Sequence, residues 1–177
     1  NINIEAATHA GIIVMNAPEG NTLSVAEHTI GMLLALVRNI PVANQSLKSG
    51  QWEKKKFMGA ELYNKTLGII GLGRIGRCVA RIASSFGMKI LGYDSYIDRA
   101  SLEESGITIL NLPGLLKQSD FITLHIPLND STYHLIGEKE FEIMKEGVCL
   151  INCSRGGIID EEALARYIQK GKVKGAA

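Results

Sequence analysis

An apolar run that passes directly into three spaced glycines is the feature that most constrains the fold of this chain. Residues 65–76 read Lys-Thr-Leu-Gly-Ile-Ile-Gly-Leu-Gly-Arg-Ile-Gly. Gly71 permits a tight turn out of a strand, Gly73 lets the backbone approach a pyrophosphate, and Gly76 lets the next helix pack on the sheet. The amino end of that helix offers free N–H groups and a positive dipole end to phosphates. The run therefore predicts a dinucleotide-binding turn.

The residues after Gly76 complete a strand–helix–strand unit. Residues 75–86 repeat apolar side chains at helical spacing, Gly87 ends that helix, and residues 89–93 read as a second strand. Asp94 stands at the end of this strand, where such folds place an acidic residue on the ribose hydroxyls of the adenosine half. The unit therefore has the order of elements that a dinucleotide-binding fold requires.

The carboxylate of Asp94 also bears on the choice of cofactor. A 2′-phosphate beside it would be repelled, so the pattern predicts NAD(H) rather than NADP(H). Arg99, five residues further on, leaves two interpretations open: an arginine that reaches a 2′-phosphate, or a solvated loop arginine.

Length and composition fit one compact domain. The chain has 177 residues, of which 46% are hydrophobic and 21% charged, enough to bury a sizeable core. Its formal net charge of +1 lacks the basic excess of a nucleic-acid binder. The apolar run at residues 30–37 is too short to span a bilayer, and no secretory signal begins the sequence. Cys78, Cys149 and Cys153 have no metal-ligand spacing, so we expect reduced thiols, no metal site and a cytoplasmic protein.

Strand and helix patterns alternate along the whole chain. This predicts an α/β fold of the Rossmann type, a doubly wound and mainly parallel sheet with helices on both faces. Residues 11–15 read as a strand, and a long helix starts at residues 21–24 and runs to Arg38, halted by Pro41, beyond which helix can resume. Further strands are expected at residues 69–71, 89–93, 107–110, 121–126, 148–153 and 173–177, and helices at residues 5–9, 138–145 and 160–169.

Three segments carry a resemblance to one protein family. They are residues 15–28 (Met-Asn-Ala-Pro-Glu-Gly-Asn-Thr-Leu-Ser-Val-Ala-Glu-His), 52–62 (Trp-Glu-Lys-Lys-Lys-Phe-Met-Gly-Ala-Glu-Leu) and 148–161 (Val-Cys-Leu-Ile-Asn-Cys-Ser-Arg-Gly-Gly-Ile-Ile-Asp-Glu). Over residues 1–177 the chain resembles the NAD-binding domain of the D-isomer-specific 2-hydroxyacid dehydrogenases. Segment 52–62 is most similar to members that oxidise 3-phosphoglycerate with NAD, at the entry to serine synthesis. The resemblance thus implies 3-phosphoglycerate, or a similar 2-hydroxy acid, as substrate.

The resemblance also implies site residues. The family's catalytic arginine corresponds to Arg155, and the chemistry agrees, because a guanidinium binds a planar carboxylate bidentately and holds C2 of a hydroxy acid near the nicotinamide. A solvated loop arginine is the alternative. Ile126 departs from the family pattern, in which a threonine is frequent. Besides the three glycines and Asp94, the implied cofactor contacts are Arg74, Ile75, His125, Ile126, Pro127, Cys153, Ser154 and Arg155.

The acid–base pair of the family, a histidine tuned by a glutamate, lies beyond residue 177 in relatives. His125 is the local substitute, although the resemblance favours a cofactor-pocket role for it. The acids at residues 160–162 fit helix capping better than general acid catalysis. Both ends suggest a fragment, because residues 173–177 begin a strand and residues 5–9 form a helix with no strand before it. We therefore expect an NAD-binding domain without its substrate domain, inactive alone.

Two features concern partners. Lys54, Lys55 and Lys56 fit either a substrate phosphate, in the site of a partner subunit, or a solvated basic turn. The helix at residues 22–37 is apolar on more than one face, which fits either a homodimer or tetramer interface or a central helix. Two other functions remain open. One is that of another enzyme of the family, such as a glyoxylate or hydroxypyruvate reductase. The other is that of an NAD(H)-sensing co-repressor, which the sequence of segment 52–62 disfavours.

Overall fold

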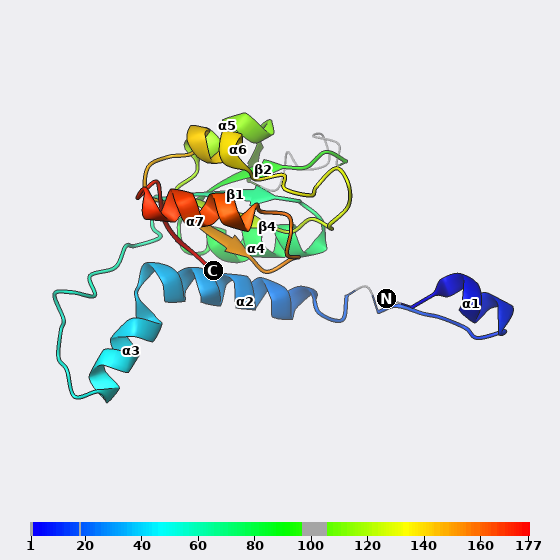
Figure 1. The fold of residues 1–177 in the computed structure, drawn as a ribbon, viewed down its shortest axis with the longest axis horizontal. Helices are drawn as coiled ribbons and strands as arrows, with labels where there is room; N and C mark the ends of the chain where they lie inside the picture. Colours follow the sequence, from blue (N-terminus) through cyan, green and yellow to red (C-terminus); the bar gives the residue numbers. More distant parts are fainter. Residues whose placement is uncertain (1, 18, 97–105) are drawn as a thin grey trace.

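The computed structural model describes residues 2–17, 19–96 and 106–177 and contains a six-stranded sheet (Figure 1). All of its strand pairs are parallel, and the strand order is β3-β2-β1-β4-β5-β6. This order reverses direction beside β1, as in a doubly wound nucleotide-binding fold. The predicted fold class is therefore confirmed. The strands are β1 (Thr66–Ile70), β2 (Lys89–Tyr93), β3 (Ile107–Ile109), β4 (Phe121–Leu124), β5 (Val148–Asn152) and β6 (Val173–Ala176).

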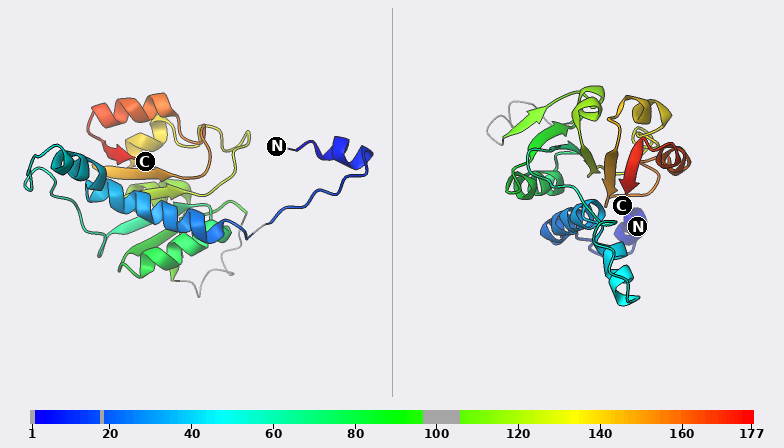
Figure 2. Two further views of the ribbon diagram at one scale, coloured as in Figure 1. Left: turned by 90° about the horizontal axis from the view of Figure 1, so that it is seen from below. Right: turned by 90° about the vertical axis from the view of Figure 1, so that its left-hand side faces the viewer.

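Helices cover both faces of the sheet (Figures 1 and 2). On one face, α2 (Thr22–Val37) and α4 (Arg74–Ser84) enclose an apolar core with alternate residues of the central strands. On the other face, α5 (Leu112–Gln118), α6 (Glu138–Ile143) and α7 (Glu161–Gln169) enclose a second core. The central strands are buried on both sides, because each face packs against helices. Within the described residues, no helix is both long and apolar enough to cross a bilayer.

Two helices stand away from the sheet. The short α1 (Ile4–His9) sits at the end of an extended arm, and α3 (Ile40–Lys48) projects beyond the end of α2 (Figures 1 and 2). Apolar side chains remain exposed on both, among them Ile4, Ile40 and Val42. These parts of the chain therefore contribute little to its own core.

The prediction of a strand at residues 11–15 is wrong. Residues 12–17 belong to no regular element, and Ile13 and Met15 are 84% and 87% exposed. An apolar run becomes a strand only where a neighbouring strand takes up its hydrogen bonds, and no strand of the described residues lies beside this arm.

The helix α2 ends where the sequence predicted, but for another reason. Asn39 adopts a left-handed conformation (φ 56°) directly after Arg38, which caps α2. Pro41 then lies in the first turn of α3, a position that proline tolerates well. Asn39, rather than Pro41, therefore separates the two helices.

The other predicted strands and helices are present, with ends that differ by at most three residues. The prediction omitted α5. Pro113 and Gly114 look like helix breakers in this segment, yet Pro113 lies in the first turn of the helix. The Asn111 side chain caps the helix by accepting from the Gly114 amide at 2.8 Å.

Candidate dinucleotide-binding site

The turn after β1 requires glycine at two positions for reasons internal to the protein. Gly71 is buried with φ 95°, and its amide donates to the Tyr93 carbonyl oxygen at 2.8 Å. A Cβ added there would stand 2.6 Å from the His125 carbonyl oxygen. At Gly76 a Cβ would overlap the carbonyl oxygen of Gly71, so the first turn of α4 packs directly on the end of β1.

Gly73 has no such internal reason to be glycine. It is exposed, its φ of −64° suits any residue, and no heavy atom of the described residues lies within 4 Å of an added Cβ. Gly73 is the N-cap residue of α4, and within the part of the chain that the structure describes no side-chain hydrogen bond caps this helix end. The open space therefore adjoins the free N–H groups of a helix, the arrangement in which proteins bind phosphate. The absence of a side chain fits the close approach of a pyrophosphate.

The first residues of α4 present both polar and apolar groups. Arg74 is exposed at the helix start, while Ile75 is half-buried against the core under α2 and α4. Arg74 also shares a groove with Thr22 and Leu23 of α2, which places the start of α2 beside the start of α4. The backbone N–H groups at this end remain open to a ligand.

Asp94 connects the end of β2 to the glycine turn. Its Oδ2 accepts a hydrogen bond from the Leu72 amide at 2.8 Å, and its Oδ1 accepts one from the Tyr96 amide at 2.8 Å. Leu72 stands between Gly71 and Gly73, so the carboxylate fixes the loop that would hold the phosphates. Sequence reasoning assigned Asp94 to the ribose and missed this second contact. Arg99, the residue considered for a 2′-phosphate, lies outside the described residues.

His125 follows β4 and lies against the same turn. Its amide donates to the Ile70 carbonyl oxygen at 2.7 Å, and its Nε2 lies 3.0 Å from Oγ1 of the buried Thr123. Its Nδ1 is buried and has no hydrogen-bond partner in the part of the chain that the structure describes, and burial lowers the pKa of His125 to about 4. The imidazole is therefore neutral at pH 7. A base of so low a pKa suits proton transfer near neutrality poorly, which disfavours His125 as the substitute acid–base group.

The two residues after His125 continue along the edge of the site. Ile126 is half-buried, and its Cγ2 would lie 2.7 Å from a Cβ added at Gly71, while Pro127 is exposed. The side chain of Ile126 therefore supplies apolar contact where the family pattern often has a hydroxyl.

Asn152 organises the loop after β5. Its Oδ1 accepts from the amide and the hydroxyl of Ser154 at 3.1 and 2.7 Å, and its Nδ2 donates to the Arg155 carbonyl oxygen at 2.9 Å. The loop is thereby held while the Arg155 side chain stays exposed, with Nη1 donating to the Ser154 carbonyl oxygen at 2.9 Å. Cys153 is half-buried against the core. An exposed guanidinium on a fixed loop suits the bidentate binding of a carboxylate.

The parallel register brings these loops together. Ile70 of β1 pairs with Leu124 of β4, and Leu124 pairs with Asn152 of β5. The loops that begin at residues 71, 125 and 153 therefore leave the sheet side by side, at the carboxyl edge where open α/β sheets bind their ligands. The structure assembles the predicted cofactor residues at this one edge.

Other residues considered from the sequence lie elsewhere or have structural roles. Asp160 is the N-cap of α7 and accepts from the Ala163 amide at 3.0 Å, as the capping interpretation predicts. The segment Lys54–Lys56 follows α3, which lies beyond the carboxyl end of α2 (Figure 1). Arg74 of the candidate site lies at the opposite, amino end of α2. Within one chain, these lysines do not reach the site.

Comparison with known proteins decides the family. The profile described as "D-isomer specific 2-hydroxyacid dehydrogenase, NAD binding domain" matches residues 30–177. The chain belongs to this family. As in other NAD-binding domains of the D-isomer-specific 2-hydroxyacid dehydrogenases, the cofactor is NAD, and the glycine turn, the free end of α4 and Asp94 fit it.

Individual relatives agree with this assignment. The D-3-phosphoglycerate dehydrogenase of Methanocaldococcus jannaschii is 51% identical over 100% of this chain and 34% of that protein. Among solved structures, the apo D-lactate dehydrogenase of Escherichia coli has a TM-score of 0.91 and 38% identity over 99% of this chain and 55% of that one. The D-lactate dehydrogenase of Aquifex aeolicus, complexed with NAD and lactic acid, has a TM-score of 0.86 and 40% identity, covering 99% and 53%. The chain spans about a third of the length of the curated relatives that it matches.

Proposed function

We propose that the full-length protein oxidises 3-phosphoglycerate to 3-phosphohydroxypyruvate with NAD, and that residues 1–177 are its NAD-binding domain. The observation that carries the cofactor role is the glycine at position 73. The fold itself does not require glycine there, whereas a bound pyrophosphate would require the space that a side chain would fill. The 51% identity to a D-3-phosphoglycerate dehydrogenase supports the substrate. The alternative substrate is another D-2-hydroxyacid or, in the reductive direction, a 2-oxo acid such as glyoxylate or hydroxypyruvate.

Different residues at the carboxyl edge of the sheet would bind different parts of the cofactor and the substrate. Gly71, Gly73 and the amino end of α4 would hold the pyrophosphate, with Arg74 and Ile75 beside it. Asp94 would bind the adenosine ribose. The loops at residues 125–127 and 153–155 would line the nicotinamide half. NAD supplies the hydride acceptor, and Arg155 would orient the substrate by binding its carboxylate.

Turnover by the full-length protein tests the substrate. We expect kcat/KM for 3-phosphoglycerate oxidation to exceed the value for glycolate at least 100-fold, since only the first substrate presents a phosphate. Equal values, or a preference for the unphosphorylated acid, would contradict the proposed substrate and leave the family intact. NADH binding without turnover of either acid would favour the co-repressor alternative.

Arg155→Lys separates substrate binding from cofactor binding. Lysine keeps the charge but loses the planar fork, so kcat/KM should fall about 100-fold, or roughly 2.7 kcal/mol, in the full-length protein. The dissociation constant of NADH should change less than about twofold, because Asn152 holds the loop backbone and, within the described residues, the Arg155 side chain bonds to the Ser154 carbonyl oxygen alone. Arg38→Lys, at an exposed position after α2, is the control. Unchanged turnover in Arg155→Lys would remove Arg155 from the site.

Asp94→Asn tests cofactor selectivity. The amide no longer repels a 2′-phosphate, and its single oxygen can accept only one of the two N–H groups that the carboxylate holds. We expect NADH binding to weaken about tenfold and the preference for NADH over NADPH to shrink by a similar factor, measured by calorimetric titration. Asp130→Asn, at an exposed loop position, should bind like the wild type. A retained preference in Asp94→Asn would place the ribose elsewhere.

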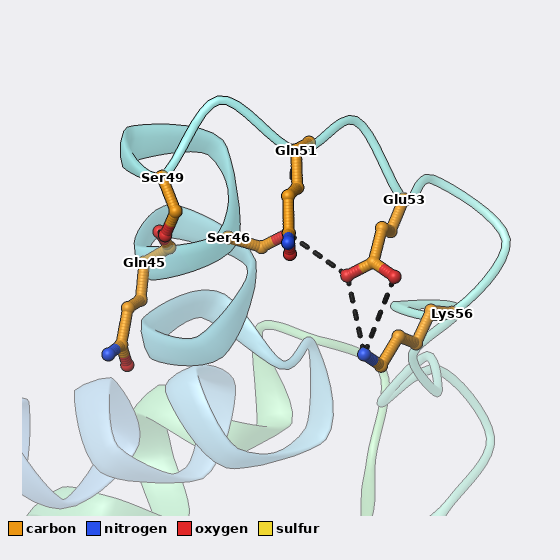
Figure 3. A network of polar contacts seen from close by, with 6 residues as sticks. All are labelled: Gln45, Ser46, Ser49, Gln51, Glu53 and Lys56. Carbon is orange, nitrogen blue, oxygen red and sulfur yellow. Dashed lines mark hydrogen bonds and ion pairs between the residues drawn. The ribbon is translucent and has the colours of Figure 1, made fainter.

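We propose a homodimer, which can associate further into a tetramer. The segment after α3 is ordered by its own contacts: Ser46 Oγ donates to Glu53 Oε2 at 3.2 Å, and Lys56 Nζ lies 3.3 Å from the same carboxylate oxygen (Figure 3). This ordered segment nevertheless leaves Trp52 78% and Met58 81% exposed. Fixed and exposed apolar side chains mark a protein contact surface.

A second copy of this chain is the proposed occupant of that surface. It would also give the exposed Lys54 and Lys55 access to a substrate phosphate in the partner's site, which they do not reach within one chain. Sedimentation equilibrium should report a dimer, and Trp52→Ala should raise the dissociation constant of that dimer at least tenfold. A wild-type protein that is monomeric at micromolar concentration would contradict this proposal.

We further propose a cytoplasmic location. Cys78, Cys149 and Cys153 are all free thiols, which supports a reducing compartment.

A further inference from the structure

A groove of about 530 Å³ opens at the amino edge of the sheet, opposite the candidate cofactor site. It lies over the starts of β1, β2 and β3, beside the end of α5. The length of β1, five residues at about 3.3 Å each, separates this edge from the glycine turn by roughly 16 Å. A groove of this size accommodates a small molecule. Its polar lining consists of Lys89, Lys117, Lys145, Thr66, Thr108 and Gln118.

Three lysines from separate parts of the chain give the groove its charge. Lys89 begins β2, Lys117 lies in the last turn of α5, and Lys145 precedes β5. Among the described residues no acidic side chain lines the groove. Lys89 and Lys117 are exposed and form no ion pair with the described part of the chain. Both side chains are open to solvent within the described part of the chain.

Lys145 is held in place by a carboxylate just outside the groove lining. Its Nζ lies 2.9 Å from Oδ1 of Asp120, whose Oδ2 accepts from the Thr66 amide at 2.8 Å. Burial raises the pKa of Asp120, but the Thr66 amide and the charges of Lys145 and Lys65 outweigh it, so the pKa is lowered overall. The carboxylate thus stays ionised and oriented, and Lys145 presents its remaining N–H groups from a defined position.

The chemistry of this lining selects an anion of high charge density. Ammonium groups act as compact point charges that bind phosphate oxygens, and threonine hydroxyls and the glutamine amide add neutral donors. A chain of linked phosphates has more acceptor oxygens and more negative charge than a single carboxylate, so it can engage lysines from separate parts of the fold. We propose that this groove binds a small molecule with two or more linked phosphate groups. The site is independent of the proposed dehydrogenase activity.

Calorimetric titration with inorganic tripolyphosphate tests the site. The full-length protein is first saturated with NADH, so that the cofactor cleft is filled, and we expect one tripolyphosphate to bind per chain. The double variant Lys89→Gln/Lys117→Gln should weaken this binding at least tenfold and leave NADH binding unchanged. Titration with ATP under the same conditions shows whether the linked phosphates belong to a nucleotide or to an inorganic polyphosphate. If ATP binds more tightly than tripolyphosphate, the groove is assigned to nucleotides. If ATP binds more weakly, the groove is assigned to inorganic polyphosphates.

Lys48→Gln/Lys139→Gln is the matched control, since it removes the same charge from exposed positions on α3 and α6. It should bind tripolyphosphate like the wild type. Equal weakening in both double variants, or no binding to the wild type, would overturn the proposal. A protein that fails to bind NADH is titrated with tripolyphosphate alone, so failure of the cofactor assignment leaves this test intact.

Discussion

Alanine at position 73 is expected to weaken NADH binding at least 30-fold, or roughly 2 kcal/mol, while the protein stays folded. The backbone of Gly73 suits any residue, and an added Cβ would meet no atom of residues 2–17, 19–96 or 106–177 within 4 Å. Alanine is a poorer N-cap than glycine, which costs about 1 kcal/mol or less of stability. The main effect is on binding, because the added methyl group would occupy the space that the pyrophosphate of NADH fills when it binds. Calorimetric titration and thermal unfolding of the same sample measure the two effects.

Two further glycines give this experiment its controls. Gly76→Ala should destabilise the fold by about 3 kcal/mol, because its Cβ overlaps the Gly71 carbonyl oxygen and neither backbone can yield. Gly31→Ala, on an exposed face of α2 with no atom near its Cβ, should be neutral or stabilise by up to about 1 kcal/mol and bind NADH normally. If Gly73→Ala binds NADH as well as Gly31→Ala does, the pyrophosphate does not lie at this turn.

The second large effect is a loss of stability in mild acid that originates at His125. Burial lowers the pKa of this group from 6.5 to about 4 in the folded protein. Below pH 6.5 the unfolded chain therefore binds a proton that the folded protein does not, and the free energy of unfolding falls as the pH falls toward 4. The difference in pKa corresponds to about 3 kcal/mol over this interval, and the stability contribution is fully present above pH 6.5.

Urea unfolding at several pH values between 7.5 and 4.5 measures this loss. His125→Asn removes the titrating group, so its stability should be lower than that of the wild type at pH 7.5 and should decline less steeply on acidification. His9→Asn, an exposed position in α1, should retain the wild-type pH dependence. Parallel curves for the wild type and His125→Asn would show that the imidazole is solvated, in conflict with its buried Nδ1.

The fold could largely be predicted from periodicity, because the central strands are short apolar runs between helical patterns. The errors share one cause, the lack of tertiary information. Residues 11–15 have the composition of a strand but no partner, and Asn39 ends α2 through a left-handed turn that the more obvious Pro41 obscured. The helix α5 was not predicted, because its short apolar segment contains Pro113, which the structure places in the first helical turn.

The candidate site could be predicted at positions where the backbone geometry allows only one type of residue. Glycine is required at positions 71 and 76 because a Cβ there would clash with nearby backbone, and these two glycines recur at a fixed spacing in the sequence of such turns. The second role of Asp94 was not predictable, because the bond to Leu72 depends on how two loops meet. The same holds for Asn152, although an amide side chain directly before a functional loop is a signal to look for loop-ordering bonds.

The central claim is that the glycine turn and Asp94 form an NAD(H) site, and titration of the folded protein with NADH and then NADPH tests it most directly. The structure predicts one NADH bound per chain and NADPH binding at least tenfold weaker, because the carboxylate of Asp94 would repel a 2′-phosphate. A folded full-length protein that binds neither nucleotide, or both with equal affinity, would contradict the assignment.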